Sequence, residues 1–455
     1  MLKTLLYILS TNALAIVIKT VSGVLFPRYM TTQAYAEYQT FSLYISYLPV
    51  LCLGLPAGLF VRYGGQPFAT IDKAGFKSAN RLLLCILTAF FFLFLVFLTI
   101  WPSRMLLAIT ICIIPYCLVC SYQSLYQAWG DFGKSNRAQL LTAVVPVLGS
   151  FAVFLLSGAL EAESFIILFM GVYWLLALGI LIKNASVTAG VEAPSPFCKI
   201  NWDIWKTGIA VSVGSYIHVM IRSLDKQIVK LLFDTTDFAM YSFALSLQSV
   251  VMLFITAISQ PLYHFLAKGQ FDREDYPVLM RCLLMLGACG GVAYHGCGWI
   301  VSVILPDYAP SLQIAAIYFL AFPPMAVIYG LYVNLYKLHR HTKVYVIRSA
   351  GVLALSLLVN ALLLVCRMDV MAVAAATVSV NYIWFFADSR CFRQVRISVK
   401  DILFMAGFVG GYLLSLRISA PLPAAAVYCL WLGLLCITVY RREVFGYLLK
   451  RNPGM

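Results

Sequence analysis

Four polar residues recur at intervals of four in one largely apolar segment, namely His218, Arg222, Lys226 and Lys230. On an α-helix this spacing forms one stripe, and Asp225 lies three residues after Arg222. Lysine and arginine bind phosphate oxygens by charge-assisted hydrogen bonds, and arginine can donate two at once. The stripe therefore predicts a site for an acidic group such as a diphosphate, with His218, Arg222 and Lys226 as ligands. The alternative is a solvated helix end, because three carboxylates up to position 237 balance the three cations from Arg222 onward.

A further cation, Lys19, lies within the first apolar run and has no acidic neighbour within a helical turn. A charged side chain near mid-bilayer costs roughly 2.5–3.5 kcal/mol on insertion scales, so such a residue is usually functional. We therefore predict that Lys19 lines a cavity and attracts the same acidic group. The alternative is that its ammonium extends to the lipid headgroups, because Phe26 is only seven residues further on.

Four other residues complete the candidate set. Arg28 and Arg62 follow the first and second apolar runs, where they either contact a substrate headgroup or only fix orientation. Asp225 and His295 are candidates for ion coupling, since histidine titrates near neutral pH. A hydrogen-bonded interior histidine is the alternative for His295.

The sequence gives no sign of a metal centre, a cofactor site or a disulfide framework. Its one CxxC pair, Cys117 and Cys120, lies in an apolar run without other ligand types nearby. Buried cysteines in such runs behave as small hydrophobic residues. There is no GxxxxGK[ST] loop for nucleotide binding, so we expect any energy to come from a proton or sodium gradient or from substrate flux.

The elements that position these residues follow from composition. Of 455 residues 62% are hydrophobic and 11% are charged, whereas globular domains carry roughly 25% charged residues. A soluble chain cannot bury that much apolar surface. The composition excludes soluble enzymes and predicts an all-α, polytopic integral membrane protein.

Apolar runs long enough for a bilayer core of ~30 Å, which needs about 20 residues per helix, give fourteen expected spans. The thirteenth is the shortest. The expected ranges are 5–26, 41–59, 82–101, 105–127, 138–160, 164–182, 208–221 with an extension at its far end, 238–262, 282–305, 312–336, 344–366, 370–387, 402–416 and 422–440.

The distribution of Lys and Arg predicts the orientation. Taking the loops alternately, 25 of the 33 basic residues lie on one side and seven on the other, and Lys19 lies within a span. By the positive-inside rule this places both termini in the cytoplasm. The basic residues form no single domain or tail, so a nucleic-acid partner is excluded. We expect the first span to be retained rather than cleaved as a signal peptide.

A short internal similarity suggests a duplicated architecture. Thr31-Thr32-Gln33-Ala34-Tyr35-Ala36-Glu37-Tyr38 follows the first span, and Thr235-Thr236-Asp237-Phe238-Ala239-Met240-Tyr241 follows the seventh. Six spans per repeat give two lobes of equal orientation, related by an axis along the membrane normal. The expected division is 1–184 and 205–388 for the six-helix lobes, 185–204 for a cytoplasmic linker, and 389–455 for two extra helices and a basic tail.

Several motifs resemble the polysaccharide-transporter, or O-antigen (Wzx-type), flippases of the multidrug/oligosaccharidyl-lipid/polysaccharide (MOP) exporter superfamily. They are Phe26-Pro27-Arg28-Tyr29-Met30 before Tyr35-Ala36-Glu37-Tyr38, Leu53-Gly54-Leu55-Pro56, Ser223-Leu224-Asp225-Lys226 before Tyr241-Ser242-Phe243-Ala244, and Leu305-Pro306-Asp307-Tyr308-Ala309-Pro310-Ser311. The chain departs from the family at Ala36, where glycine is usual. The resemblance implies a bacterial inner-membrane protein that moves an undecaprenyl-pyrophosphate-linked oligosaccharide to the periplasmic leaflet by alternating access.

Three functions remain open at this point. The expected one is a flippase whose partners are the lipid-linked oligosaccharide, membrane lipids and other polysaccharide-assembly membrane proteins. An ion-coupled exporter of small molecules is the alternative within the same architecture. A glycan-modifying membrane enzyme is the third, but the short loops and the five histidines offer no catalytic constellation, so we expect no enzymatic activity.

Overall fold

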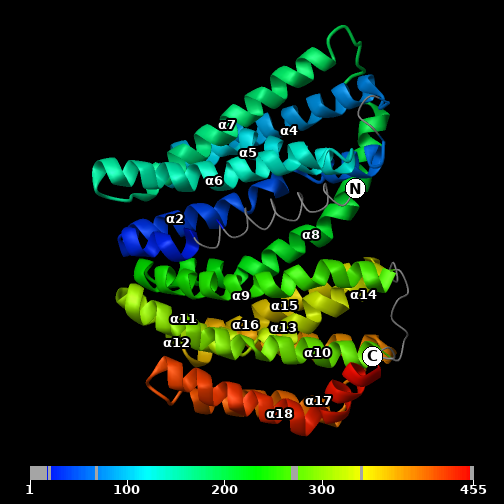
Figure 1. Ribbon diagram of the computed structural model, residues 1–455. Helices are drawn as coiled ribbons and strands as arrows, with labels where there is room; N and C mark the ends of the chain where they lie inside the picture. Colours follow the sequence, from blue (N-terminus) through cyan, green and yellow to red (C-terminus); the bar gives the residue numbers. More distant parts are fainter. Residues whose placement is uncertain (1–17, 19–21, 67–69, 268–274, 339–341, 451–455) are drawn as a thin grey trace. The chain divides into compact units, whose positions relative to one another are not determined.

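The computed structural model describes residues 18, 22–66, 70–267, 275–338 and 342–450. The chain divides into two compact units, Met1–Gln227 and Ile228–Met455, which are described one at a time. Every element of the described part is helical (Figure 1), which confirms the all-α class.

The apolar helices account for most of the expected membrane spans. Within the described residues, ten helices are long and apolar enough to cross a membrane, and two bent helix pairs raise the number to twelve if each pair is one span. The expected thirteenth span is a helix of 17 residues. The expected first span lies largely outside the described residues. The structure therefore supports a polytopic membrane protein.

The first unit begins with helical residues 22–29. Short polar side chains start three of the helices that follow: Thr31, Asp72 and Asp131 each accept a hydrogen bond from a backbone N–H of the first turn. The elements are α2 (Thr32–Ile45), η1 (Leu48–Cys52), α3 (Leu55–Tyr63), α4 (Lys73–Ile100), α5 (Arg104–Ala128), α6 (Phe132–Ser157), α7 (Ala162–Val187) and α8 (Lys199–Leu232), of which α8 ends in the second unit.

The expected span 41–59 is broken in the structure. Helices α2 and α3 meet at an angle of 60°, and Leu53 and Gly54 between them have φ values of 49° and 80°. Pro49 is the second residue of the 3₁₀ turn η1, and a left-handed pair cannot continue a helix. Hydropathy alone does not register this break, because the residues on both sides of it are apolar.

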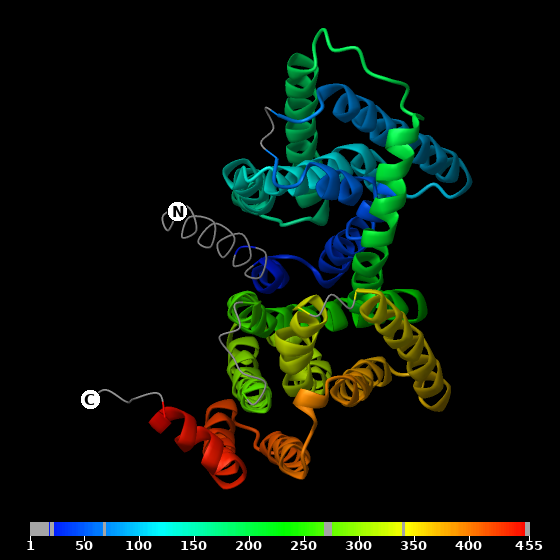
Figure 2. The same ribbon diagram turned by 90° about the vertical axis from the view of Figure 1, so that its right-hand side faces the viewer.

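Helix α8 lies against α3 with almost no side chain between the two backbones. A Cβ atom added at Gly58 would overlap the carbonyl of Ile204, and one at Gly54 would lie 2.7 Å from the backbone of Gly208. Small residues four apart, such as Gly54 and Gly58, allow this approach between membrane helices. Figure 2 shows α8 (green) passing beside the blue segment that contains α3.

The segment between α7 and α8, residues 188–198, is held on α4. The ammonium of Lys77 donates to the carbonyls of Thr188 and Val191, at 3.0 and 2.9 Å. Ser78 donates to the carbonyl of Ser195 and accepts from Asn201. This segment is shorter than the expected linker 185–204, because α7 continues to Val187 and α8 begins at Lys199. The division into lobes at 184 and 205 stays a prediction.

The second unit contains one more bent pair. Helices α12 and α13 meet at 53°, where Pro323 and Pro324 enter the first turn of α13. A π-helical turn follows directly in η3. The elements are α9 (Thr235–Ala267), α10 (Tyr276–Ala288), α11 (Gly290–Ile304), η2 (Pro306–Tyr308), α12 (Ser311–Phe319), α13 (Phe322–Val327), η3 (Ile328–Tyr332), α14 (Val333–Leu338), α15 (Thr342–Cys366), α16 (Val370–Cys391), η4 (Arg393–Val395), α17 (Val399–Ser415) and α18 (Pro421–Lys450).

The two similar sequence segments form similar local structures. Thr31 accepts a hydrogen bond from the backbone N–H of Ala34 at the start of α2. Asp234 accepts one from the N–H of Asp237 at the start of α9. The two helices then differ, since α2 breaks after 14 residues and α9 continues for 33.

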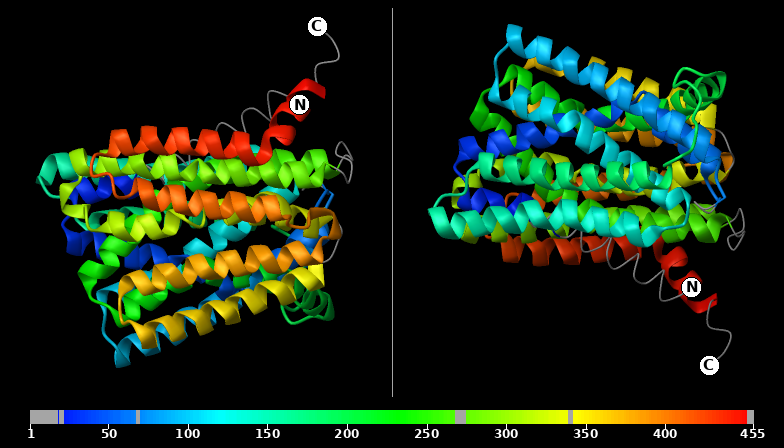
Figure 3. Two further views of the ribbon diagram at one scale, coloured as in Figure 1. Left: turned by 90° about the horizontal axis from the view of Figure 1, so that it is seen from below. Right: turned by 90° about the horizontal axis from the view of Figure 1, so that it is seen from above.

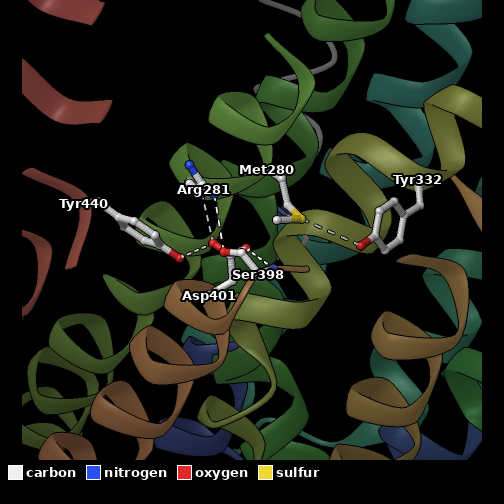
Figure 4. Close-up of polar contacts among 6 residues, drawn as sticks. All are labelled: Met280, Arg281, Tyr332, Ser398, Asp401 and Tyr440. Atoms are coloured by element: carbon white, nitrogen blue, oxygen red, sulfur yellow. Dashed lines mark hydrogen bonds and ion pairs between the residues drawn. The ribbon is translucent and has the colours of Figure 1, made fainter. Parts of the chain in front are cut away.

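A buried charge cluster joins the last two helices to α10. Asp401 in α17 is fully buried and accepts from the Arg281 guanidinium at 3.0 Å and from the Tyr440 hydroxyl at 2.9 Å. Its other oxygen accepts from the backbone N–H and the hydroxyl of Ser398. Figure 4 shows these side chains converging on the carboxylate, and Figure 3 shows α17 and α18 lying side by side. We call Arg281, Ser398, Asp401 and Tyr440 the Asp401 cluster.

Candidate functional site

Lys226 is joined to two other helices by a chain of hydrogen bonds within the first unit. Its ammonium donates to the side-chain oxygen of Gln39 in α2 at 2.6 Å. The amide of Gln39 donates to the hydroxyl of Tyr35 at 2.6 Å, and Tyr35 donates to the carbonyl of Gly23. Gln39 and Tyr35 are buried. The structure therefore holds this cation at a defined position among these helices, hydrogen-bonded to the Gln39 amide and close to the Asp225 carboxylate.

Two more contacts continue this line along α8. Ser223 accepts from the hydroxyl of Tyr47 at 2.8 Å, and Tyr216 donates to the carbonyl of Pro49 at 3.1 Å. Residues 216, 223 and 226 thus face 49, 47 and 39 in reverse order, so α8 runs antiparallel to the α2–η1 segment. We call these three contacts the α8 ladder.

A cavity of about 310 Å³ lies beside the ladder, between the break after α2, α5 and α8. Its wall carries hydroxyl, amide and thiol groups together with proline and aromatic rings. Among the described residues that line it, none carries a formal charge. The lining residues are Pro49, Cys52, Pro56, Ala57, Phe60, Cys117, Cys120, Ser121, Ser124, Gln127, Val211, Ser212 and Tyr216.

The break between α2 and α3 is what positions this wall. It brings Pro49 and Cys52 of η1 and Pro56, Ala57 and Phe60 of the α3 segment to the cavity from two directions. On the α5 side, residues 117, 120, 121, 124 and 127 recur at helical spacing and so share one face. If the expected span 41–59 were one straight helix, only one of its two halves could line the cavity.

The other predicted cations lie nearer the surface of the first unit. Arg222 and Arg28 are exposed, and His218 is partly exposed. Arg62 is exposed in the last turn of α3, with its guanidinium 5.9 Å from the ring centre of Tyr63. Lys19 lies outside the described residues.

The two predicted ion-coupling residues are both buried. Asp225 is 5% exposed and accepts from the backbone N–H of Lys226 at 2.7 Å. In the second unit, a ring nitrogen of His295 lies 2.9 Å from the hydroxyl of Ser415, and its ring lies among Tyr294, Tyr412 and Tyr428. This environment is that of a hydrogen-bonded interior histidine.

Sequence reasoning missed a buried carboxylate in α16. Asp388 is 1% exposed and accepts from the Tyr336 hydroxyl at 3.1 Å and the Trp384 ring N–H at 2.9 Å. The expected span ended at 387, whereas α16 continues to Cys391. A signal was present, because Trp384 and Asp388 are four residues apart and so share a helix face.

The sequence analysis also missed Gln39 and Tyr35. They are a polar (i, i+4) pair of the kind that interacts on one helix face, but Tyr35 was considered only within the repeat and family motifs, and both motifs end before Gln39. The partner of this pair, Lys226, lies 187 positions from Gln39 in the chain. No local pattern links residues so far apart.

A second, smaller cavity of about 180 Å³ lies at the ends of α5, α6 and α7. One carboxylate and two lysines line it: Lys134 forms an ion pair with Asp131 and lies 5.8 Å from the ring centre of Tyr126, and Lys183 is the second lysine. Asp131 has a lowered pKa; its partial burial alone would raise the pKa, but the hydrogen bonds and charge of Lys134 outweigh this. Aromatic and lysine side chains are common at membrane surfaces.

The arrangement can bind a polar molecule but offers no reactive constellation. Within the described ranges no group of three or more His, Cys, Asp or Glu side chains is placed to hold a metal ion. The candidate site is thus a helix bundle with a neutral polar cavity and a cation, Lys226, held further along the same helix.

Comparison with known proteins finds a likeness at the level of the fold alone. No protein-family model and no curated protein sequence matches the chain. Among solved structures, the lipid II flippase MurJ in an inward closed conformation is similar over 96% of this chain and 100% of its own, with 13% sequence identity and a TM-score of 0.59. The MATE transporter ClbM in complex with Rb⁺ aligns over 87% of this chain and 92% of its own, with 15% identity and a TM-score of 0.37. The chain therefore has the fold of the MurJ structure.

Proposed function

We propose that this protein is a flippase of the MOP type, which carries a lipid-linked oligosaccharide from one leaflet of the membrane to the other. A shared fold supports transport in general, but function must come from the site. The observation that carries the proposal is Lys226, a cation hydrogen-bonded to Gln39 between helices of the first unit and aligned by the α8 ladder with an uncharged polar cavity.

The chemistry of such a cargo fits this arrangement. Its headgroup joins an anionic diphosphate to neutral sugars, while its lipid stays in the bilayer. The Lys226 ammonium, which contacts Gln39, is a group that donates charge-assisted hydrogen bonds to phosphate oxygens. Exposed Arg222, one turn earlier on α8, supplies a bidentate donor for phosphate oxygens. We assign diphosphate binding to Lys226 and Arg222, with Lys19, Arg28, Arg62 and His218 as further cations along the path.

The finer assignments belong to the same proposal. The cargo is an undecaprenyl-pyrophosphate-linked repeat unit of O-antigen or a related surface polysaccharide, and the family is that of the Wzx-type flippases. The protein lies in the bacterial inner membrane with both termini in the cytoplasm, and no covalent bond of the cargo changes. Energy comes from a proton or sodium gradient, for which Asp225 and His295 are the coupling candidates and Asp388 is a third.

The decisive experiment measures flipping in vesicles that contain the purified protein. A fluorescent polyprenyl-diphosphate oligosaccharide is followed with an impermeant reagent that destroys label on the outer leaflet. We expect Lys226→Gln to slow flipping by about 10- to 100-fold, because a hydrogen bond to a charged group contributes roughly 1.5–3 kcal/mol.

Two further variants make this result specific. Lys226→Arg keeps the charge and is expected to recover most of the rate. Lys206→Gln removes an exposed cation of the same helix, which lies over the ring of Trp202, and is expected to flip normally. Equal rates for Lys226→Gln and the unaltered protein, or no protein-dependent flipping at all, would contradict the proposal.

A further inference from the structure

The uncharged cavity beside the α8 ladder points to a selection for neutral sugars, which deepens the proposed function and rests on it. We propose that this cavity receives an uncharged sugar ring of the lipid-linked glycan and excludes acidic sugars. The site is separate from the cations that take the diphosphate.

The wall of the cavity offers what a neutral sugar needs. Sugar hydroxyls both donate and accept. The Ser121 and Ser124 hydroxyls donate to the carbonyls of Cys117 and Cys120 and so act toward a sugar as acceptors, while the side-chain amide of Gln127 carries both donors and an acceptor. Phe60 and the ring of Tyr216 provide flat apolar surfaces for the C–H faces of a ring. At about 310 Å³ the cavity is at the lower end of the ~300–1,000 Å³ range of ligand pockets. It therefore holds a short part of a glycan rather than the whole cargo.

Charge decides against an acidic sugar. A carboxylate that leaves water for a protein cavity needs a cation or several donors to replace its hydration. The described residues of the wall include no lysine, arginine or histidine. They include no aspartate or glutamate either, so the same wall does not favour the small cationic molecules that a drug exporter would carry.

The α8 ladder fixes how far this cavity lies from the proposed diphosphate site. Tyr216, which lines the cavity, precedes Lys226 by ten residues, a rise of about 15 Å along a helix. Both side chains contact the α2–η1 segment, so both lie on the same side of α8. A distance of about 15 Å exceeds the length of one sugar ring. The ring in the cavity is therefore not the one bonded to the diphosphate but one further along the glycan.

The test compares two cargoes in the vesicle assay. Both are polyprenyl diphosphates that carry a trisaccharide; one is neutral throughout, and the other has a uronic acid as its last sugar. We expect the unaltered protein to flip the neutral cargo at least about tenfold faster. The reason is that an uncompensated buried charge costs more free energy than a tenfold change in rate represents.

A matched pair of positions on α5 assigns this preference to the cavity. Gln127 lines the cavity, whereas Gln123, one turn earlier on the same helix, does not. Gln127→Lys is expected to raise the ratio of acidic to neutral flipping by roughly tenfold, and the nearly isosteric Gln127→Glu to lower it. Gln123→Lys and Gln123→Glu are expected to leave the ratio unchanged.

The outcomes separate this inference from the function on which it rests. If both cargoes flip equally fast and no Gln127 variant alters their ratio, the cavity is not the sugar site, although flipping itself stands. If the Gln123 variants change the ratio as much as the Gln127 variants do, the selection lies elsewhere and the inference is wrong. If the unaltered protein moves neither cargo, the proposed function fails and takes this inference with it.

Discussion

Asp401→Leu is expected to lower the free energy of unfolding by about 3–5 kcal/mol, because it leaves the Arg281 guanidinium buried without its counterion. The carboxylate is fully buried and the arginine side chain is 15% exposed. The substitution also removes the acceptor of Tyr440 and of both Ser398 donors. Because the carboxylate is fully buried, the loss exceeds that of a surface ion pair.

A double-mutant cycle distinguishes a broken ion pair from a general packing defect. Arg281→Met alone is expected to cost a similar amount, but Arg281→Met with Asp401→Leu less than the sum, because an apolar pair removes both buried charges. The measurement is denaturant unfolding of the detergent-solubilised protein. Glu163→Leu is the control, since its partner Arg104 is 93% exposed and exposed pairs contribute about 0–1 kcal/mol. Additive losses in the cycle would refute the ion-pair explanation.

The consequence of losing the Asp401 cluster should be local. It joins α10 to α17 and to α18, while Tyr428 of α18 donates separately to the carbonyl of Ala288 at 2.7 Å. Helix α18 therefore has a second attachment, in its first third. We expect Asp401→Leu to loosen the α17 start and the Tyr440 end of α18 before the rest of the unit.

Hydropathy was sufficient for the fold class and for most span positions, because each span satisfies its own length requirement independently of its neighbours. Hydropathy failed where contacts between distant parts of the chain decide the structure. Arg281 served only as an orientation signal, since its partner Asp401 is 120 positions away. The apolar run at 41–59 was predicted as one span, and hydropathy gave no sign of its break, since Leu53 and Gly54 lie among apolar residues.

The candidate site could be predicted only in part, because residue spacing within one helix is a local pattern but the partners of those residues are not. The cationic residues of α8 were found from their spacing, and the structure places one of them, Lys226, in a specific contact. That its partner is Gln39, and that an uncharged cavity continues the same ladder, depends on how α2, α5 and α8 pack. Packing of this kind is set by small residues and by helix breaks, whose effect on a neighbouring helix no hydropathy pattern records.

Gly58→Leu is expected to have the largest effect of all on the first unit, a loss of at least about 3 kcal/mol together with loss of flipping. Overpacking usually costs roughly 1–3 kcal/mol when side chains can move aside. Here the added Cβ overlaps the backbone carbonyl of Ile204, and neither helix can yield without moving the other. Separating α3 from α8 also displaces Ala57 and Ser212 of the cavity wall.

Two companion variants test whether backbone contact is the cause. Gly171→Leu places the same side chain on α7, where an added Cβ meets nothing within 4 Å, and is expected to be nearly neutral in folding and flipping. Ile204→Ala combined with Gly58→Leu is expected to restore little stability, because the overlapped atom is the carbonyl oxygen and survives the substitution. Recovery of the folded, active protein in that double variant would mean that side-chain crowding, rather than the backbone approach of α3 and α8, limits this position.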